Sequence, residues 1–297
     1  MPVQSRPRRT APYPSDVPEL PEVETIRRDL HGLVVGRRIE DVWVEEATAP
    51  LLLNRPLDAF RQELVGRRVT EIDRRGKFLL FRLDDGTTWA VHLRMTGRLV
   101  WRPSGAPPEP YERGRVRFDC GQDLRWCDVR KFGRWALVAR DEELLASLGP
   151  EPIDPTFSVE TLANALRGRR APVKAVLLDQ RRIAGLGNIY ADEALFAAGL
   201  RPDAPAGSLD ADAVQRLYNA IVDVVRRGIE HRGASFRDYV DAQGDEGKQQ
   251  MYVQVFRRTG KPCYRCGTPI ARIVVGGRST HFCPVCQRFP EARGAKA

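Results

Sequence analysis

Four cysteines near the C-terminus have the spacing of a metal site. Cys263 and Cys266 form one C-x2-C pair, Cys283 and Cys286 form another, and sixteen residues separate the two pairs. This spacing fits the C-x2-C-x15–20-C-x2-C pattern of zinc sites. Each pair turns on a tight knuckle, and two knuckles place four thiolates around one ion. Because four sulfurs leave no position for water, the zinc is expected to be structural.

Two disulfides are the alternative for these cysteines. The opening segment, residues 1–16, is rich in Pro and Arg and has no apolar middle, so it does not read as a secretory signal. A reducing cytosol keeps thiols reduced. We therefore expect one structural zinc ion and a cytoplasmic protein. Cys120 and Cys127 stand alone and are expected to have no ligand role.

The charge of the chain favours an acidic polymer as its partner. The formal net charge is +9 and the isoelectric point is about 9.5. From Arg257 onward nine Lys and Arg residues stand against one acidic residue, Glu291. A solvated basic tail would give the same charge, but the cysteine spacing favours a folded basic module. No apolar run approaches the ~18 residues of a membrane span, so no membrane partner is expected.

Two kinds of periodicity divide the chain. Apolar residues at helical spacing predict a helix over residues 22–33. Between Arg38 and Val138, short alternating runs and turn signals predict the strands of a β-sandwich or barrel. These predicted strands cover residues 39–44, 68–72, 78–83, 87–93, 115–118 and 124–127.

The second half of the chain has a different pattern. Residues 148–155 contain three prolines and read as a linker. Helical spacing follows at residues 159–166, 172–178, 190–198 and 210–230. The runs 270–275 and 279–282 read as two strands joined by a Gly-Gly turn, which makes a zinc-stapled β-hairpin. The predicted division is a disordered extension (1–17), a β-domain (18–147), a linker (148–155), a helical domain (156–256), a zinc finger (257–290) and a tail (291–297).

Seven segments, in order along the chain, resemble the formamidopyrimidine-DNA glycosylase family. They are PELPEVET (18–25), RGKFLL (75–80), HLRMTG (92–97), DVRKFG (128–133), LGPEP (148–152), GLGNIYADE (185–193) and the four-cysteine finger. The resemblance covers residues 18 to about 288. One short motif arises by chance, whereas seven in register do not. The ELPEV form resembles the formamidopyrimidine branch rather than its sister branch, endonuclease VIII.

The resemblance implies a multidomain α+β fold and an activity. The expected parts are an N-terminal β-sandwich, a helix–two-turns–helix DNA-binding domain and a C-terminal zinc-finger β-hairpin, with damaged double-stranded DNA in the cleft between them. The implied enzyme is bifunctional and monomeric. It excises oxidised purines, namely 8-oxoguanine and formamidopyrimidines, and cleaves the abasic site by β,δ-elimination. Structural zinc is the only cofactor that the resemblance implies.

Catalysis is assigned by the resemblance to Pro18 and Glu19. A free α-amino group has a pKa of about 8, against ~10.4 for lysine, so more of it is neutral and nucleophilic at physiological pH. A secondary amine that attacks the sugar C1′ leaves an iminium, and Glu19 would act as general acid and base at the deoxyribose ring oxygen. Pro and Glu alone are equally typical of a helix N-terminus. The complete set of motifs favours catalysis.

The sequence departs from the family pattern at this proline. As written, the Pro18 nitrogen is bonded to Val17 and is an amide, which cannot form an iminium. Pro2 is followed by Val3 and Gln4 and has no acidic partner. Our hypothesis is that translation begins at residue 17, at a GTG codon, and that removal of the initiating residue exposes Pro18. The competing hypothesis keeps residues 1–17 and makes the protein a damaged-DNA binder without lyase activity. A zinc ribbon fused to an unrelated enzyme is disfavoured by the full-length motif order.

Further roles follow from the resemblance. Lys77 would lie in the cleft, contact phosphate and assist β-elimination, although a solvated surface lysine is equally typical of its setting. His92 and Asn188 resemble two phosphate ligands. Arg278 at the tip of the zinc-finger hairpin resembles a further phosphate ligand, the fourth after Lys77, His92 and Asn188, and would assist δ-elimination. At Gly185-x-Gly187-Asn188, glycine would let the backbone approach DNA, and a helix start would favour an anion.

Three residues match the set that fills the gap left by an extruded base. Met95, Arg130 and Phe132 would offset part of the few kcal/mol needed to unstack it. Core packing is the ordinary fate of such Met and Phe residues, but their polar and Gly neighbours predict loop tips instead.

Weaker candidates and one departure complete the predicted site. Tyr111, Arg169, Arg170 and Lys174 are further candidates for facing DNA. Residues 244–252 stand where the family has a lesion-capping loop, but their sequence departs from the family's Gly-Tyr-Phe-Gln run. We therefore expect altered or weaker contacts to 8-oxoguanine.

Overall fold

The computed structural model describes residues 18–290. The predicted extension at 1–17 and tail at 291–297, and with them the hypothesis about residue 17, lie outside the described residues. The first half of the described chain is a β-sandwich of two antiparallel four-stranded sheets, with strand orders β1-β6-β7-β5 and β2-β3-β4-β8. The strands are β1 (Ile39–Val44), β2 (Val69–Arg75), β3 (Phe78–Leu83), β4 (Thr88–His92), β5 (Gly97–Pro103), β6 (Glu112–Phe118), β7 (Gln122–Asp128) and β8 (Arg134–Val138).

The inner faces of the two sheets meet over an aromatic core. Trp89, Trp126 and Trp135 are fully buried, and the ring of Trp135 lies 5.0 Å from that of Trp89 and 4.9 Å from that of Trp126. Such close aromatic packing stabilises the fold by more than the burial of its apolar area alone would do. The predicted sandwich is therefore confirmed.

Some elements of the sandwich could not be predicted from the sequence patterns. Strand β8 is buried at four of its five residues, so it lacks the polar and apolar alternation that marks a half-exposed strand. Strand β5 begins inside the segment that read as a motif. The helix α2 (Leu57–Leu64), the short helix α3 (Glu142–Leu145) and the 3-10 turn η1 (Glu46–Leu51) were also not predicted.

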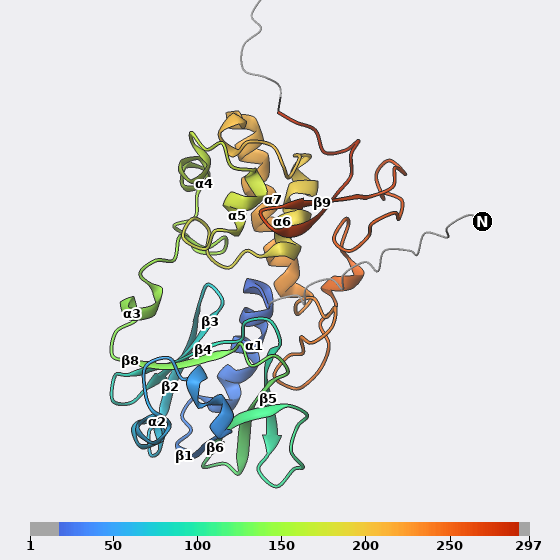
Figure 1. Ribbon diagram of the computed structural model, residues 1–297. Helices are drawn as coiled ribbons and strands as arrows, with labels where there is room; N and C mark the ends of the chain where they lie inside the picture. Colours follow the sequence, from blue (N-terminus) through green and yellow to red (C-terminus); the bar gives the residue numbers. More distant parts are fainter. Residues whose placement is uncertain (1–17, 291–297) are drawn as a thin grey trace, which may run out of the picture.

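The first helix, α1 (Leu20–Val34), joins the two halves of the molecule (Figure 1). Its first residue, Leu20, packs in the core of the helical domain. One turn later, Val23, Ile26 and Leu30 pack in the core of the sandwich. The apolar stripe at helical spacing thus serves two cores, and the start of α1 is held at their boundary.

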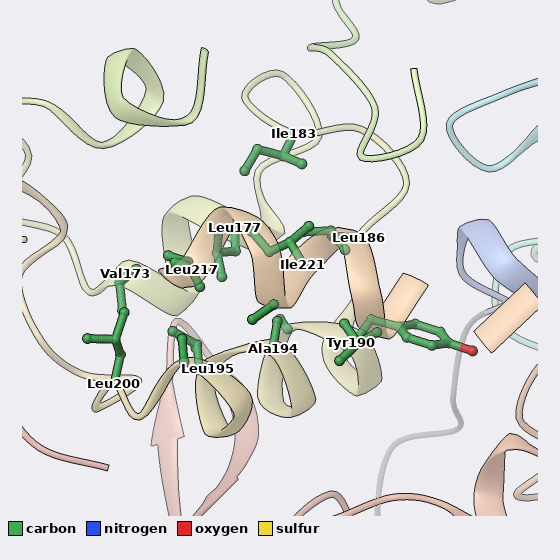
Figure 2. Close-up of a cluster of buried hydrophobic side chains, with 14 of the residues drawn as sticks. Val173, Leu177, Ile183, Leu186, Tyr190, Ala194, Leu195, Leu200, Leu217 and Ile221 are labelled. Atoms are coloured by element: carbon green, nitrogen blue, oxygen red, sulfur yellow. The ribbon is translucent and has the colours of Figure 1, made fainter. Parts of the chain in front are cut away.

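The helical domain has four main helices around one apolar core. They are α4 (Val159–Leu166), α5 (Val173–Leu178), α6 (Asn188–Ala198) and α7 (Ala211–Glu230), with 3-10 turns η2 (Ala206–Ser208) and η3 (Gln249–Met251). Asp210 caps α7 by accepting a hydrogen bond from the Ala213 N–H at 2.7 Å. Figure 2 shows the core between α5, α6 and α7, with the hydroxyl end of Tyr190 pointing out of it towards α1.

The C-terminal module is the predicted hairpin. Strand β9 (Ala271–Val275) pairs with β10 (Arg278–Phe282), and β9 lies beside the helical domain in Figure 1. The turn residues Gly276 and Gly277 have φ of 56° and 74°, a conformation that glycine adopts without steric strain. Arg278 is therefore the first residue after the turn, as the sequence predicted.

Candidate active site

A pocket of 510 Å³ lies between the β-sandwich, the helical domain and the hairpin. It brings together seven of the predicted site residues from separate parts of the chain. These are Glu19, Lys77, His92, Met95, Phe132, Asn188 and Arg278. Of the lining residues that the sequence reasoning missed, Arg94 and Arg134 add two more cations. The pocket is suited to a polyanion because four of its lining residues are Lys or Arg.

Glu19 occupies the boundary between the two domains. It is the N-cap of α1 and is 2 % exposed. Its carboxylate accepts hydrogen bonds from the backbone N–H groups at the start of α6, Gly187 at 2.7 Å and Ile189 at 2.8 Å. Burial raises the pKa of Glu19 to about 8, while the nearby ammonium of Lys77 opposes this shift. A carboxyl group with such a pKa holds a proton at neutral pH and can donate it.

The glycines of the GLGN segment make room for this contact. A Cβ at Gly187 would lie 2.3 Å from the carboxyl carbon of Glu19, and one at Gly185 would lie 2.6 Å from Leu20 Cδ1. This finding corrects an expectation from the sequence. The glycines accommodate the start of α1, and the group that the helix N-terminus binds is the Glu19 carboxyl.

A second buried carboxyl group, that of Glu22, helps to hold Glu19 in place. Glu22 accepts hydrogen bonds from the Glu19 N–H at 2.9 Å, the Tyr190 hydroxyl at 2.7 Å and the Ala234 N–H at 2.7 Å. Burial raises the pKa of Glu22 as well. The first turn of α1 is thereby tied to α6 and to the segment that follows α7, so its position is fixed from three directions.

Lys77 stands at the turn between β2 and β3, which the linker holds in place. Glu151, 4 % exposed, pairs with Arg74 and Arg75 at 2.9 Å each and accepts a hydrogen bond from the Gly76 N–H. Burial lowers the pKa of Lys77, against the opposing influence of Glu19. The sequence reasoning treated the LGPEP segment only as a linker and motif. Its glutamate positions the turn that carries the lysine.

The geometry of His92 fixes its protonation. The Arg94 N–H donates a hydrogen bond to His92 Nδ1 at 3.0 Å, so the ring proton of the neutral form is on Nε2. Burial, together with Arg94 and Lys77, lowers the pKa of His92 to about 3. His92 is therefore a neutral hydrogen-bond donor at physiological pH.

Asn188 joins the pocket to the hairpin. Its side-chain amide donates a hydrogen bond to the Ser279 carbonyl at 3.0 Å, next to the exposed Arg278. Asn188 and Arg278, both predicted site residues, are thus neighbours in the structure although β10 lies 90 residues further along the chain.

Lys174 is not a DNA-facing residue, and the prediction that it is was wrong. Its side chain is fully buried, and its ammonium lies 2.6 Å from Asp192. It also donates to Thr280 Oγ1 at 2.8 Å. No local pattern indicates this burial, because the partners lie on α6 and β10, far from Lys174 along the chain.

The predicted gap-filling residues meet on two adjacent turns. Arg130 Nη1 lies 3.4 Å from the sulfur of Met95, and its guanidinium stacks 4.6 Å from the ring centroid of Phe132. Phe132 is 40 % exposed. These residues lie at loop tips, as their neighbours in the sequence indicated.

Besides Lys174 and Arg130, three further predicted site residues lie apart from the main pocket wall. Pro18 is buried and lines a small neighbouring cavity with Glu22 and Tyr239. Tyr111, 55 % exposed, lies beyond the end of β7, where its carbonyl accepts a hydrogen bond from the Asp128 N–H. Arg169 lies on the helical domain, with its Nε bonded to the Ala165 carbonyl at 2.7 Å.

The four cysteines fit one tetrahedral metal ion. Their sulfurs all lie within 4.8 Å of one another, with Cys263 and Cys286 at 3.9 Å and Cys266 and Cys283 at 3.5 Å. Four thiolates about 2.3 Å from a zinc ion stand about 3.8 Å apart. The N–H groups of Arg265 and Cys286 donate to sulfurs within the knuckles, as ligand-orienting groups do. The site holds one structural zinc ion.

Comparison with known proteins gives consistent results over nearly the whole chain. Residues 17–135 match the model of the formamidopyrimidine-DNA glycosylase N-terminal domain, and residues 148–240 match that of its H2TH domain. Residues 260–288 match the model of a zinc finger found in FPG and IleRS. Within residues 18–290, no helix combines the length and the apolar character that a membrane span requires.

Individual relatives agree with these matches. The chain is 46 % identical to the formamidopyrimidine-DNA glycosylase of Gloeobacter violaceus over 285 residues, covering 93 % of this chain and 99 % of that protein. The enzyme of the same name from Moorella thermoacetica is 49 % identical over 262 residues, covering 86 % and 94 %.

Solved structures extend the likeness to three dimensions. A mutant of Lactococcus lactis FPG in complex with DNA containing Fapy-dG is 37 % identical and has a TM-score of 0.85. The match covers 91 % of this chain and all of that one. A structure of MutM with DNA containing carbocyclic 8-oxo-G has a TM-score of 0.84 at 37 % identity, with the same coverage. The chain therefore belongs to the formamidopyrimidine-DNA glycosylase family.

Proposed function

We propose that this protein excises oxidised purines from duplex DNA and then cleaves the abasic site by β,δ-elimination, through a covalent iminium on Pro18. One observation carries the proposal: Glu19 at the start of α1, Lys77 between β2 and β3, and Arg278 on the zinc-finger hairpin line a single pocket. The relatives with solved structures were bound to DNA containing Fapy-dG and 8-oxo-G, which supports this class of lesion.

The proposed reaction assigns a task to each group. The Pro18 nitrogen attacks the sugar C1′, and the bond between C1′ and the base breaks with its electron pair leaving on the base. The new C1′–nitrogen bond leaves an ammonium, which loses its N–H proton to the departing base. The restored nitrogen lone pair then forms the iminium as the bond from C1′ to the ring oxygen breaks, and Glu19 protonates that oxygen. Its raised pKa supports this role because the proton is present at neutral pH. Removal of a C2′ proton expels the 3′ phosphate, and a second elimination expels the 5′ phosphate.

The nucleophile must be a free amine in this reaction. A proline nitrogen within the chain is an amide and has no available lone pair. We therefore propose that the active form begins at Pro18. The burial of Pro18 beside Glu22 and Tyr239 supports an environment that favours the neutral amine, because low dielectric disfavours an ammonium.

Phosphate binding falls to four groups in this proposal. Lys77, His92, Asn188 and Arg278 offer donors to the backbone of the damaged strand. The His92 ring supplies an Nε2–H donor whose presence does not depend on pH near neutrality, since its pKa is about 3. Lys77, whose pKa burial lowers, would take up the proton released in β-elimination, and Arg278 would assist δ-elimination.

The gap-filling task falls to Met95, Arg130 and Phe132. A base inside a duplex is out of reach, so it must be unstacked at a cost of a few kcal/mol. An apolar wedge and an arginine facing the orphan base offset part of this cost. The exposure of Phe132 and its contact with Arg130 support this role.

Contacts to the extruded base are proposed to differ from the family pattern. The segment 244–252 packs on the end of α7, where Tyr252 stacks 3.9 Å from the His231 ring and Gln249 Oε1 lies 2.7 Å from His231 Nδ1. None of its residues lines the 510 Å³ pocket. This arrangement supports altered or weaker recognition of 8-oxoguanine.

We propose a monomeric cytoplasmic protein with a catalytic domain at residues 18–147, a linker at 148–155, a DNA-binding domain at 156–256 and a zinc finger at 257–290.

Strand cleavage tests the proposed function. An end-labelled duplex with one 8-oxoguanine is incubated with the protein, and the product ends are separated by electrophoresis. We expect a product with a 3′-phosphate end from the damaged duplex and none from the undamaged one. Tight binding to the lesion without cleavage would instead support the damaged-DNA binder.

A further inference from the structure

One buried carboxylate holds both turns that carry the gap-filling residues. Asp128, the last residue of β7, is fully buried. Its Oδ1 accepts hydrogen bonds from the Thr96 hydroxyl at 2.5 Å and the Arg130 N–H at 3.1 Å. Its Oδ2 accepts from the N–H groups of Phe132 at 2.9 Å and Gly133 at 2.7 Å. The two oxygens thus bind donors from two segments that are more than thirty residues apart in sequence.

Thr96 completes the link between the turns. Its hydroxyl donates to Asp128 and accepts a hydrogen bond from the Arg130 N–H at 3.1 Å. Thr96 follows Met95 directly, and Arg130 and Phe132 flank Lys131. Fixing Thr96, Arg130 and Phe132 therefore fixes the backbone of all three gap-filling residues.

Both turns need such support because each contains a strained residue. Arg94 has φ of 56° and Lys131 has φ of 55°, in the left-handed region that residues other than glycine rarely adopt. Conformations of this kind persist only where the surroundings determine them. The donors to Asp128 flank Lys131 on both sides, and Thr96 lies two residues after Arg94.

The close approach of the second turn also depends on Gly133. A Cβ at this position would lie 2.8 Å from the Trp126 ring and 3.1 Å from Asp128 Oδ2. The turn can reach the carboxylate only because Gly133 has no side chain. The segment from Asp128 to Gly133 is thus built so that its backbone wraps around its own first side chain.

We infer that Asp128 is a positioning residue that presents Met95, Arg130 and Phe132 to the duplex as one rigid unit. The inference rests on the proposed function, because it assumes that these three residues fill the gap left by an extruded base. A preformed wedge lowers the free energy needed to reach the extruded state, since its own ordering entropy has already been lost on folding. Asp128 does not itself line the pocket.

The experiment compares two substrates of the same enzyme. An 8-oxoguanine duplex requires base extrusion, whereas a duplex with a preformed abasic site has no damaged base to unstack. In Asp128→Asn an amide NH2 replaces one carboxylate oxygen. This NH2 group cannot accept the hydrogen bonds that two donors make to that oxygen in the wild type. We expect kcat/KM on the 8-oxoguanine duplex to fall roughly 100-fold, or about 2.7 kcal/mol. On the abasic duplex it should fall no more than roughly fivefold.

Asp123→Asn is the matched control. Asp123 is a fully buried aspartate of the same strand, and it binds Ser104 Oγ at 2.8 Å and Arg117 Nε at 3.2 Å, away from the two turns. A general loss of stability in the sandwich would act equally on both substrates in this variant. If Asp128→Asn does not fold, Thr96→Val removes the bridging hydroxyl at almost constant volume and should change the substrate ratio in the same direction.

Amide hydrogen exchange gives a readout without activity. Peptides that cover residues 129–134 should exchange faster in Asp128→Asn than in the wild type and no faster in Asp123→Asn. The inference is overturned if Asp128→Asn lowers both substrates by the same factor, or if exchange at 129–134 does not change. Failure of the wild-type protein to cleave the 8-oxoguanine duplex would refute the proposed function instead. The exchange measurement would still test whether Asp128 holds the second turn, because it does not depend on activity.

Discussion

The ammonium of Lys174 lies 2.6 Å from the carboxylate of Asp192, and both side chains are fully buried. Lys174 also donates to the Ser279 carbonyl at 3.0 Å, and Asp192 accepts a hydrogen bond from the His281 N–H at 2.9 Å. This ion pair therefore ties α5 and α6 to β10. The strand that begins with Arg278 is held against the pocket by charges inside the protein, as well as by zinc at its far end.

Removing one member of this pair should destabilise the fold. Lys174→Met leaves Asp192 as an uncompensated buried charge, for which a loss of about 3–5 kcal/mol in the free energy of unfolding is typical. Urea denaturation measures the change. The control is Arg181→Met, which breaks the exposed pair with Asp179 and should have little effect. A lysine that served DNA would behave differently: Lys174→Met would weaken binding and leave stability unchanged.

The space at Gly187 should be essential for base excision. In Gly187→Ala the new Cβ would meet the Glu19 carboxyl carbon at 2.3 Å and displace the proposed acid. We expect the rate of base release to fall roughly 100-fold, within the range that general acid–base catalysis contributes. Gly32→Ala is the control, because this exposed position of α1 has no atom within 4 Å of the new Cβ. Equal rates for the two variants would rule out the steric argument.

The raised pKa of Glu19 should appear in the pH dependence of stability. The folded protein binds this proton with a pKa of about 8, while the ordinary value is 4.5. The stability that Glu19 contributes is therefore complete below about pH 4.5 and is lost as the pH rises to about 8. Urea denaturation between pH 5 and 8 should show a smaller loss for Glu19→Gln than for the wild type.

The control for this titration is Glu160→Gln at an exposed position of α4. Its curve should run parallel to that of the wild type. If Glu19→Gln also runs parallel, the Glu19 carboxyl is ionised throughout this range and cannot be the proton donor at neutral pH. Base release by the wild type should in turn decline above about pH 8, where the acid form of Glu19 disappears.

Zinc should be needed for the hairpin and for DNA binding. Structural zinc contributes about 10–16 kcal/mol to the folding of small zinc modules. Elemental analysis should find one zinc ion per chain in the wild type and in Cys120→Ser, and much less in Cys266→Ser. The affinity of Cys266→Ser for duplex DNA should fall because Arg278 loses its rigid support. Full zinc content in Cys266→Ser would contradict the four-cysteine site.

Much of the fold could be predicted from local patterns in the sequence. The helix α4 lies at the predicted residues, and the predicted strand 115–118 lies within β6, because helical spacing and alternation record burial on one face. The cysteine spacing identified the zinc site because both knuckles are local. Strand β8 has no such record, since it is buried on nearly every residue.

Contacts between distant segments could not be predicted in this way. Glu19 and Ile189 are 170 residues apart, and nothing local indicates that a carboxylate at the start of α1 caps α6. Lys174 was a weaker candidate for facing DNA, whereas its buried pair with Asp192 shows that it is internal. Likewise, the roles of Glu151 and Asp128 depend on which backbone groups the fold brings to their oxygens.

The central claim, that the nitrogen of residue 18 forms the covalent intermediate, is tested by borohydride trapping on an 8-oxoguanine duplex followed by mass-spectrometric mapping of the adduct. Borohydride reduces an iminium to a stable amine, so the linked residue is preserved. We predict one adduct, on the nitrogen of Pro18 at the first position of its chain, which is lost in Pro18→Gly and retained in Pro2→Gly. An adduct on Lys77 or any other side chain, or normal strand cleavage without any trapped species, would contradict the account.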